Sequence, residues 1–456
     1  MTPNFFAYIA LLGWPIIVVV LFKRYPVNKA IILTILWGYL LLPVGLSVDF
    51  PLIPPFNKET LPVLVAFFII RFQLGRRVKL FAQFDSIGVI MSIYLISPTI
   101  TVLSNQVSLN TGGKVISGLS LHDGISVLIS QWILLLPFLL GRQFLNKTSD
   151  LEMILRFIVI AGLVYSVLIL FEIRMSPQLH RWVYGYHNVG FAQQKRGGGF
   201  RSTVFLGHGL WVAYFVMMAT VVAAIFWKLK YRVINSIPAM HITIYLFVVL
   251  LLSKSLGSLI YAIAFIPLIL WGSVAMNARI VKVLVVICIL YPLLRLYDYF
   301  PLATILDWAY AYDVNRGQSL QYRFDQEGAL LAHANQHFLF GWGGWGRNRI
   351  YDALGNDISI TDGHWIITLG VYGLVGFLAE FSLLLLPVYK TVSWIKNIHN
   401  PKDKLTLMCF SIILIIYVVD LLPNDPMSPL TWLIAGALYG NYETQREVYK
   451  SRAGKK

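Results

Sequence analysis

Residues 5–22 read FFAYIALLGWPIIVVVLF, an apolar run that contains no charged side chain. A helix of about 20 such residues crosses the hydrocarbon core of a bilayer. Backbone amides find no partners in lipid, so spanning segments form helices or closed barrels, and barrel strands would alternate apolar with polar residues. The four residues before the run are uncharged, and no small-residue cleavage site follows it. We therefore interpret it as a retained span and not as a signal peptide.

Similar apolar runs recur along the whole chain of 456 residues, which is 57% hydrophobic and only 13% charged. Soluble domains carry roughly a quarter charged residues. We therefore predict an all-α integral membrane protein, a single membrane domain over residues 1–456 built as a polytopic bundle of about 12–13 transmembrane helices. The predicted spans are 5–22, 30–46, 61–74, 86–103, 122–140, 154–172, 208–227, 240–252, 256–274, 281–297, 364–387, 404–421 and 428–440. We expect the short spans at 61–74, 240–252 and 428–440 to be tilted, broken or re-entrant.

Basic residues fall in every second short loop, beginning with Lys23 and Arg24 and continuing with Arg76 and Arg77. Loops rich in Lys and Arg stay in the cytoplasm. With an odd number of spans, the N-terminus is expected outside and the C-terminus in the cytoplasm. Most of the net charge of +16 is then explained by membrane topology, and it does not imply that the protein binds nucleic acid. The two cysteines lie in separate apolar runs and predict no disulfide framework.

Two segments are too long for tight connections, residues 173–207 and residues 298–363, and both are assigned to the external side. The first contains KRGGGFRSTVFLGHG, residues 195–209. Its three glycines allow close backbone approach, and Arg196 and Arg201 offer forked donors that match phosphate geometry. The segment therefore predicts a pyrophosphate site. A flexible positive loop that binds anionic lipid head groups is the alternative.

The second segment contains QSLQYRFDQEGALLAHANQHFLF, residues 318–340, which we interpret as an external amphipathic helix. Arg316 and Arg323 are seven residues apart and therefore lie on one face of it. The following GWGGWGRNR carries Trp342 and Trp345, which either stack on sugar rings or serve as interfacial anchors.

Two histidines on this predicted helix, His333 and His337, have the i, i+4 spacing of metal ligands. They lack the Glu of an HExxH motif and have no cysteine nearby, so we expect no metal.

A third pattern is SITDGHWIITLGVYGLVGFLAEF, residues 359–381, which opens the eleventh predicted span. Asp362 is a natural N-cap, so His364 would lie in the first helical turn, where the helix dipole disfavours a second positive charge. A neutral imidazole there can act as a general base. A structural histidine at the membrane interface is the alternative.

The same pattern predicts a straight helix beyond His364. Three glycines at spacings of three, residues 370, 373 and 376, are expected to serve close helix packing. Glu380 would lie about 24 Å further down the helix, which excludes it as a partner of His364.

Taken together, these segments resemble the O-antigen ligase and polymerase superfamily, which are membrane glycosyltransferases of GT-C-like architecture with a helical periplasmic cap. The motifs are FRSTVFLGHG, then LSKSLGSL, then SLQYRFDQEGALL with FLFGWGGWG, and finally DGHWIITLGVYGLVG, in the family's order over roughly residues 195–385. The resemblance implies a bacterial inner membrane protein with its active site on the periplasmic face. Its donor would be an undecaprenyl-diphosphate-linked glycan, and its acceptor a glycan or the lipid A core.

The resemblance also implies roles for individual residues. His364 would deprotonate the acceptor hydroxyl, while Arg201 and Arg323 would bind the diphosphate without a metal or other cofactor. Further substrate-binding candidates are Arg196, Arg316, Trp342, Trp345 and Asp362. Two positions depart from the family, Lys254 where many members have arginine, and Trp365 where a small or polar residue is frequent.

Ligase and polymerase remain open, since the donor is shared and only the acceptor differs, although the two tryptophans slightly favour a polymerase. A flippase or transporter of an anionic lipid-linked substrate is the alternative function, and a structural membrane scaffold is a weaker one. Transporters place ionisable residues near the bilayer midplane, whereas His364, Arg201 and Arg323 are predicted at or outside the membrane surface.

Overall fold

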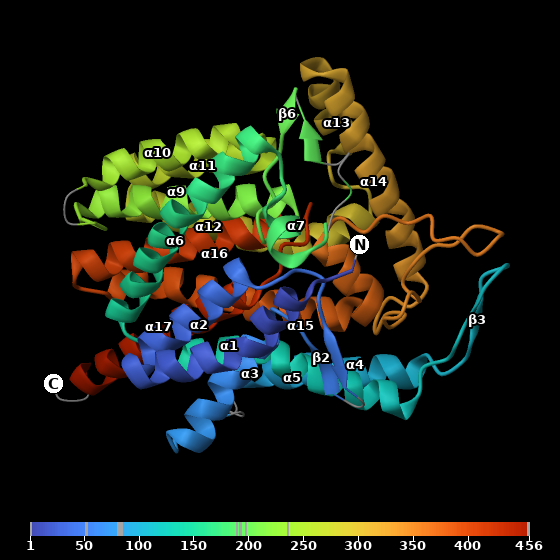
Figure 1. Ribbon diagram of the computed structural model, residues 1–456, viewed down its shortest axis with the longest axis horizontal. Coiled ribbons are helices and arrows are strands. Elements are labelled where there is room, and N and C mark those ends of the chain that lie inside the picture. The colour runs from blue at the N-terminus through green and yellow to red at the C-terminus, as the bar shows by residue number, and fades with distance from the viewer. Residues whose placement is uncertain are drawn as a thin grey trace.

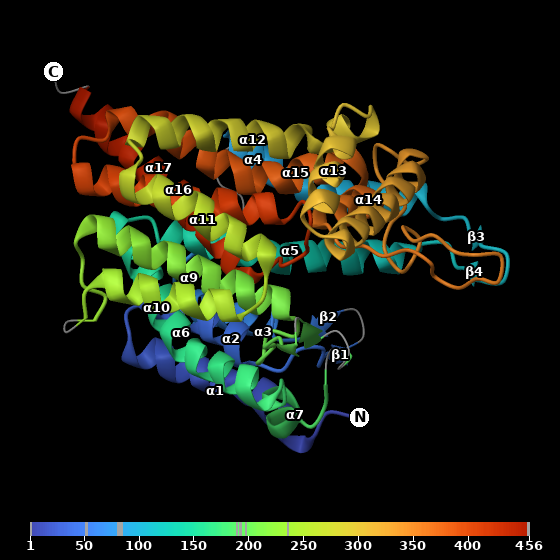
Figure 2. The same ribbon diagram turned by 90° about the horizontal axis from the view of Figure 1, so that it is seen from above.

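The computed structural model of the chain describes residues 2–50, 53–79, 85–187, 190, 194–196, 198–234 and 237–453. Most of them form helices that run roughly along one direction (Figures 1 and 2). The first half contains α1 (Phe5–Arg24), α2 (Val27–Leu41), α3 (Leu61–Phe68) with a π-helical end (Ile69–Gln73), α4 (Ser86–Ser104), α5 (Leu121–Phe144), α6 (Thr148–Met175) and α7 (Leu179–Tyr184). The second half contains α9 (Gly209–Leu229), α10 (Ala239–Leu252), α11 (Leu256–Trp271), α12 (Val274–Leu296), α13 (Leu302–Tyr312), α14 (Val314–Asn335), α15 (His364–Trp394) with a 3₁₀ end (Ile395–Asn397), α16 (Pro401–Asp420) and α17 (Pro429–Ala453).

The all-α prediction is confirmed, and each of the thirteen predicted spans coincides with a helix. Among the described residues, seven helices are long and apolar enough to cross a membrane, namely α1, α4, α5, α6, α9, α12 and α15. The apolar helices α2, α3, α10 and α11 are shorter. The prediction that all thirteen cross the membrane, and that the architecture is GT-C-like, stays a prediction.

One end of the bundle carries a cap of short elements and the helices α13 and α14, while the C-terminus lies at the opposite end (Figures 1 and 2). Among the described residues, short strands in the cap form three two-stranded antiparallel sheets. They are β1 (Val48–Phe50) with β2 (Ile53–Phe56), β3 (Leu109–Asn110) with β4 (Val115–Ile116), and β5 (Lys195–Arg196) with β6 (Gly199–Phe200).

The predicted amphipathic helix is α14, and a buried carboxylate fixes it to the bundle. The Glu327 carboxylate forms a 2.5 Å ion pair with Arg295 of α12, and it accepts hydrogen bonds from the side chains of Tyr291 and Trp365. Arg295 is 7% exposed, so the pair is sheltered from water. This contact holds the arginine-bearing face of α14 over the cap end of the bundle.

Helix α15 is broken and does not form the straight span that the sequence predicts. Gly373 has φ 68° and ψ −171°, outside the helical region. The segment from Phe338 to Gly343 fills the break: Trp342 N–H donates to the Gly370 carbonyl (2.9 Å), and Leu374 N–H donates to the Phe338 carbonyl (2.7 Å). Gly373 therefore allows the chain to leave the helix and turn back. The prediction that this glycine serves only close helix packing is wrong.

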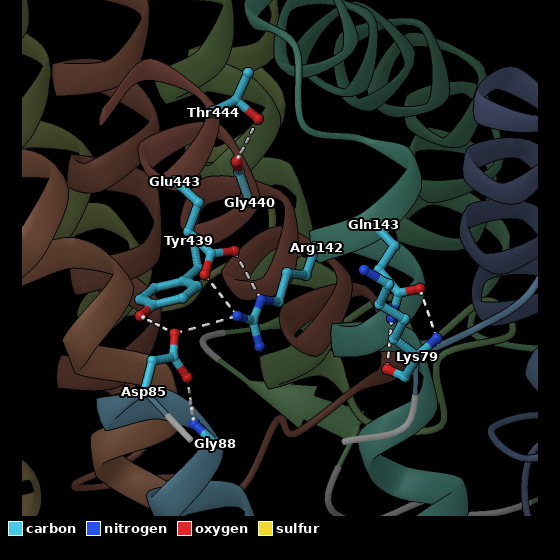
Figure 3. A network of polar contacts seen from close by, with 9 residues as sticks. All are labelled: Lys79, Asp85, Gly88, Arg142, Gln143, Tyr439, Gly440, Glu443 and Thr444. Atoms are coloured by element: carbon cyan, nitrogen blue, oxygen red, sulfur yellow. Dashed lines mark hydrogen bonds and ion pairs between the residues drawn. The ribbon is translucent and has the colours of Figure 1, made fainter. Parts of the chain in front are cut away.

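An ion-pair network ties three helices together away from the cap (Figure 3). Arg142, in the last turn of α5, binds both carboxylate oxygens of Glu443 in α17 at 2.8 and 2.5 Å. It also contacts Asp85 at 3.3 Å, and Asp85 caps α4 by accepting from Gly88 N–H. Because Arg142 is only 8% exposed, this network fixes the start of α4, the end of α5 and the middle of α17 relative to one another.

Replacing Glu443 with alanine is expected to lower the free energy of unfolding by about 3 kcal/mol, because it leaves a buried guanidinium with its bidentate partner removed. The matched control is Glu447→Ala, one turn further along α17 at an exposed position, which should change stability by less than about 0.5 kcal/mol. Unfolding of both variants in detergent micelles measures the difference. Equal stability of the two variants would show that the network contributes nothing.

Candidate functional site

Arg201 lies in a tight loop whose shape is set by a buried carboxylate. Glu172, near the end of α6, accepts hydrogen bonds from Ser202 Oγ (3.0 Å) and from the backbone N–H groups of Thr203 and Val204 (2.8 Å each). These bonds stabilise Val204 at φ 43°, an unusual value for a β-branched residue. The loop therefore projects Arg201 from a rigid base.

The glycine run before Arg201 forms part of the β5–β6 hairpin, in which Arg196 pairs with Gly199. A Cβ at Gly199 would lie 2.5 Å from the Lys254 amine, and one at Gly209 would lie 2.6 Å from Arg201 Cδ. Both cations therefore pack directly over a glycine. The side chain of Arg196 and all of Gly197 lie outside the described residues.

A cavity of about 620 Å³ lies beside this loop, and we call it the guanidinium cavity. Arg201, Arg316 and Arg323 line it, so the prediction that the two α14 arginines share a face is confirmed. Its other walls are largely apolar and come from α9, α11, α13 and α14, with Leu210, Leu256, Ile260, Ile305, Trp308 and Leu320 among them. The cavity thus joins a cluster of positive charge to a hydrophobic surface.

Asp362 is not the N-cap of α15, because Gly363 occupies that position and no side chain caps the helix there. Instead, the Asp362 carboxylate lies 3.2 Å from Arg323 Nε, with both side chains more than a third exposed. The N-cap prediction is therefore wrong. Asp362 offsets part of the charge of Arg323 at the rim of the guanidinium cavity.

His364 is the first residue of α15, as predicted, but its ring lies between two carboxylates. Nδ1 is 2.8 Å from Asp425 and Nε2 is 3.0 Å from Glu380. The break at Gly373 brings Glu380 back beside His364, so the prediction that excluded Glu380 is wrong. Ionised carboxylates only accept hydrogen bonds, so each ring nitrogen then carries a hydrogen. The prediction of a neutral imidazole did not take these two carboxylates into account, and it is wrong for a ring that lies between them.

Asp425 precedes α17 and is more open than Glu380, since their side chains are 43% and 8% exposed. Burial raises the pKa of Asp425, but the hydrogen bond and the charge of His364 outweigh it, so the pKa lies below its ordinary value. Glu380 is also held by the hydroxyl of Thr368 at 3.1 Å. The imidazole is thus anchored from inside by Glu380 and faces the open side with Asp425.

A second cavity of about 270 Å³ lies on that open side, and we call it the histidine cavity. His364, Asp425 and Glu59 line it. The two cavities adjoin: Trp211 lines both, and the neighbouring residues Asn424 and Asp425 each line one of them. The structure therefore places the predicted histidine and the predicted arginines in neighbouring cavities that share one tryptophan wall.

The two cap tryptophans have different environments. Trp342 is 8% exposed, and its indole lies against His333 and His337 with ring centroids 4.5 and 3.8 Å apart. Its Nε1 donates to the His333 carbonyl at 2.8 Å. Its faces are thus taken by histidines, and we assign it to packing of the cap. Trp345 is 55% exposed and remains a sugar-binding prediction.

No group of three or more His, Cys, Asp or Glu side chains suited to a metal occurs in the described part of the chain. His333 and His337 pack on the indole ring of Trp342. Trp365, which departs from the family pattern, is fully buried and donates to Glu327. It therefore supports the docking of α14 and does not line the histidine cavity.

Sequence reasoning missed Glu59, Glu172, Trp211 and Asp425. Glu59 and Asp425 lie in short polar breaks between apolar segments, NKET and PNDP, which gave a local signal of a turn but none of a site. Their association with His364 depends on the packing of helices that are far apart in the sequence, since Asp425 is 61 residues from His364 and Glu59 is much farther away. Only the arrangement of α3, α9, α15 and α17 in space brings them together.

No protein-family model matches the chain, and no curated protein matches its sequence.

Proposed function

We propose that the protein is a membrane glycosyltransferase that moves a glycan from an undecaprenyl-diphosphate carrier to an acceptor hydroxyl, in the manner of O-antigen ligases and polymerases. The observation that carries the proposal is the pair of adjoining cavities, one lined by three arginines and apolar side chains, the other by His364 and Asp425. A lipid diphosphate needs both anion recognition and an apolar wall. The proposal includes a GT-C-like fold in a bacterial inner membrane, with the cap facing the periplasm.

In this proposal, Arg201, Arg316 and Arg323 hold the diphosphate in the guanidinium cavity. The bond between the anomeric carbon and the phosphate oxygen breaks, and the leaving diphosphate takes the electron pair. Fixed guanidinium groups stabilise the charge that grows on it, a role that Mg²⁺ plays in many phosphate sites. The acceptor oxygen forms the new bond to the anomeric carbon from the side of the histidine cavity.

Proton uptake is assigned to the His364–Asp425 pair and not to an isolated imidazole. Glu380 fixes Nε2 from the buried side, so the acceptor hydroxyl reaches the pair from the side of Asp425. The Asp425 carboxylate takes the hydroxyl proton as the new bond forms, because both ring nitrogens of His364 already carry hydrogens. Asp425 in addition holds the ring orientation, since its oxygen lies 2.8 Å from Nδ1.

The direct test mixes the purified protein in proteoliposomes with a lipid-diphosphate glycan and either lipid A core or a second lipid-linked repeat unit. Transfer to one of the two acceptors supports the proposal and separates ligase from polymerase. Binding of the donor without transfer to either acceptor, under conditions where a characterised transferase is active, would contradict it.

Arginine-to-lysine replacement at position 323 or 201 is expected to weaken donor binding by about tenfold or more. Lysine keeps the charge but loses the two-pronged geometry that matches a phosphate. Arg349→Lys is the matched control, because Arg349 pairs with Asp357 in the distal part of the cap and lines a different cavity. Equilibrium binding of a fluorescent lipid diphosphate measures the change. Wild-type affinity in both lysine variants would remove the diphosphate assignment.

Transport of an anionic lipid-linked substrate is the second candidate, and one observation favours it. Helix α15 is discontinuous at Gly373, and the ionisable pair His364 and Glu380, one residue from each part of the helix, is largely sheltered from solvent. Discontinuous helices with buried ionisable groups are common at transporter binding sites. Movement of a labelled lipid diphosphate between leaflets of proteoliposomes, without formation of a glycosidic bond, would favour transport over transfer.

A further inference from the structure

The two cavities have opposite electrostatic character. Three arginines and one carboxylate, Asp420, line the guanidinium cavity. Among the described residues, no arginine or lysine lines the histidine cavity, whereas the carboxylates Glu59 and Asp425 do. His364 is the one cationic side chain among the described residues that line it, and it already lies between two carboxylates. The histidine cavity therefore offers carboxylate acceptors and no uncompensated positive charge.

Glu59 is fixed in place by a local turn. The Asn57 side chain accepts hydrogen bonds from the backbone N–H groups of Glu59 (2.8 Å) and Thr60 (3.0 Å), which forms an Asx turn just before α3. The Glu59 side chain is exposed and lines the cavity. Its neighbour Lys58 points away, with its amine donating to the Phe205 carbonyl at 3.0 Å.

Burial lowers the pKa of Lys58 to about 7, although Glu59 acts against this shift. Lys58 also does not line the histidine cavity.

The remaining walls suit a sugar ring in shape. Trp211 and Trp432 provide aromatic surfaces, and Ile133, Leu134 and Pro137 of α5 provide an apolar one. A volume of about 270 Å³ lies below the roughly 300–1,000 Å³ of pockets for drug-sized ligands. The cavity therefore fits one ring with hydroxyls facing the carboxylates, and not a longer chain.

We propose that the histidine cavity binds the acceptor end of the glycan as an uncharged sugar, and that Glu59 excludes acidic sugars from it. This inference rests on the proposed transferase function and adds the class of acceptor to it. An acidic sugar would bring a third carboxylate beside Glu59 and Asp425, and like charges at close range disfavour binding strongly. Neutral hydroxyls instead donate to the same oxygens.

The test compares two acceptor oligosaccharides that differ only in the terminal ring, a neutral hexose or the matching hexuronic acid. Binding of each to the protein in nanodiscs and transfer to each are both measured. The neutral acceptor is expected to bind at least about tenfold more tightly. Glu59→Gln should reduce this preference by about tenfold. Asp307→Asn, which removes an exposed carboxylate on α13 outside both cavities, should leave it unchanged.

The outcomes separate the two proposals. Selective binding of the neutral acceptor that depends on Glu59, without any transfer, would keep the acceptor site and overturn the transferase. Transfer to both acceptors with equal efficiency, unchanged by Glu59→Gln, would keep the transferase and overturn the acceptor proposal. Donor binding in the guanidinium cavity should be the same in wild type and Glu59→Gln, which shows that the variant is folded.

Discussion

Glycan transfer is expected to fall at least about hundredfold when His364 is replaced by glutamine, because the variant loses the ring that orients the Asp425 carboxylate for uptake of the acceptor proton. Glutamine still offers an amide N–H to one of the two carboxylates that flank position 364. The loss should appear in the turnover rate and leave donor affinity nearly unchanged, because His364 does not line the guanidinium cavity. Steady-state kinetics in proteoliposomes measure both quantities.

The control for this substitution separates chemistry from folding. His122→Gln changes an exposed histidine at the start of α5 and should leave activity unaltered. His364→Ala is expected to lose activity and also about 3–5 kcal/mol of stability, since it leaves Glu380 and Asp425 without their shared cation. A folded His364→Gln protein with more than about a tenth of wild-type activity would exclude the His364–Asp425 pair as the base.

Much of the helical framework was predictable because lipid imposes a simple rule on the sequence. Every long apolar run must close its backbone hydrogen bonds internally, so length and composition locate the helices to within a few residues. The positions of α13 and the three hairpins were not predictable in the same way. They lie at the cap end, where water satisfies the backbone and the apolar pattern is weak.

The arginines and the histidine of the candidate site were predictable, but the residues that surround the histidine were not. Arg201, Arg316 and Arg323 follow from their side-chain chemistry and helical spacing, and they do line one cavity. The partners of His364 did not follow, because a helical pattern gives no indication of where a glycine leaves the helix. A straight helix and a broken one have the same apolar spacing in this stretch, and the decisive contact comes from a loop segment outside it.

The cap loop and the broken helix form one structural unit, which explains why a glycine-rich turn and a histidine-bearing helix occur in the same chain. Asn105, at the end of α4, donates to the Gly341 carbonyl at 2.9 Å, and Thr101 contacts the Phe340 carbonyl. Residues 338–343 are therefore held on one side by α4 and on the other by the break in α15. The position of Glu380 beside His364 depends on this unit.

Alanine at position 373 is accordingly expected to be among the most damaging single substitutions in the protein. With φ 68° and ψ −171°, Gly373 occupies a region that is nearly exclusive to glycine, and a Cβ there would lie 2.4 Å from backbone atoms of Leu339 and Phe340. Backbone atoms cannot rotate away, so the loop must leave the break or the helix must straighten. We expect a loss of at least about 3 kcal/mol of stability, together with loss of the His364–Glu380 contact and of activity.

The matched control for Gly373→Ala is a second glycine-to-alanine substitution, which is expected to raise stability and not to lower it. Gly13 lies inside α1, and a Cβ there meets nothing within 4 Å. Gly13→Ala should therefore stabilise the protein by about 0.5–1 kcal/mol, through the ordinary helix preference of alanine over glycine. Thermal unfolding in detergent compares the two variants directly. If Gly373→Ala unfolds at the same temperature as Gly13→Ala, α15 is continuous, and the arrangement that brings Glu380 to His364 does not exist.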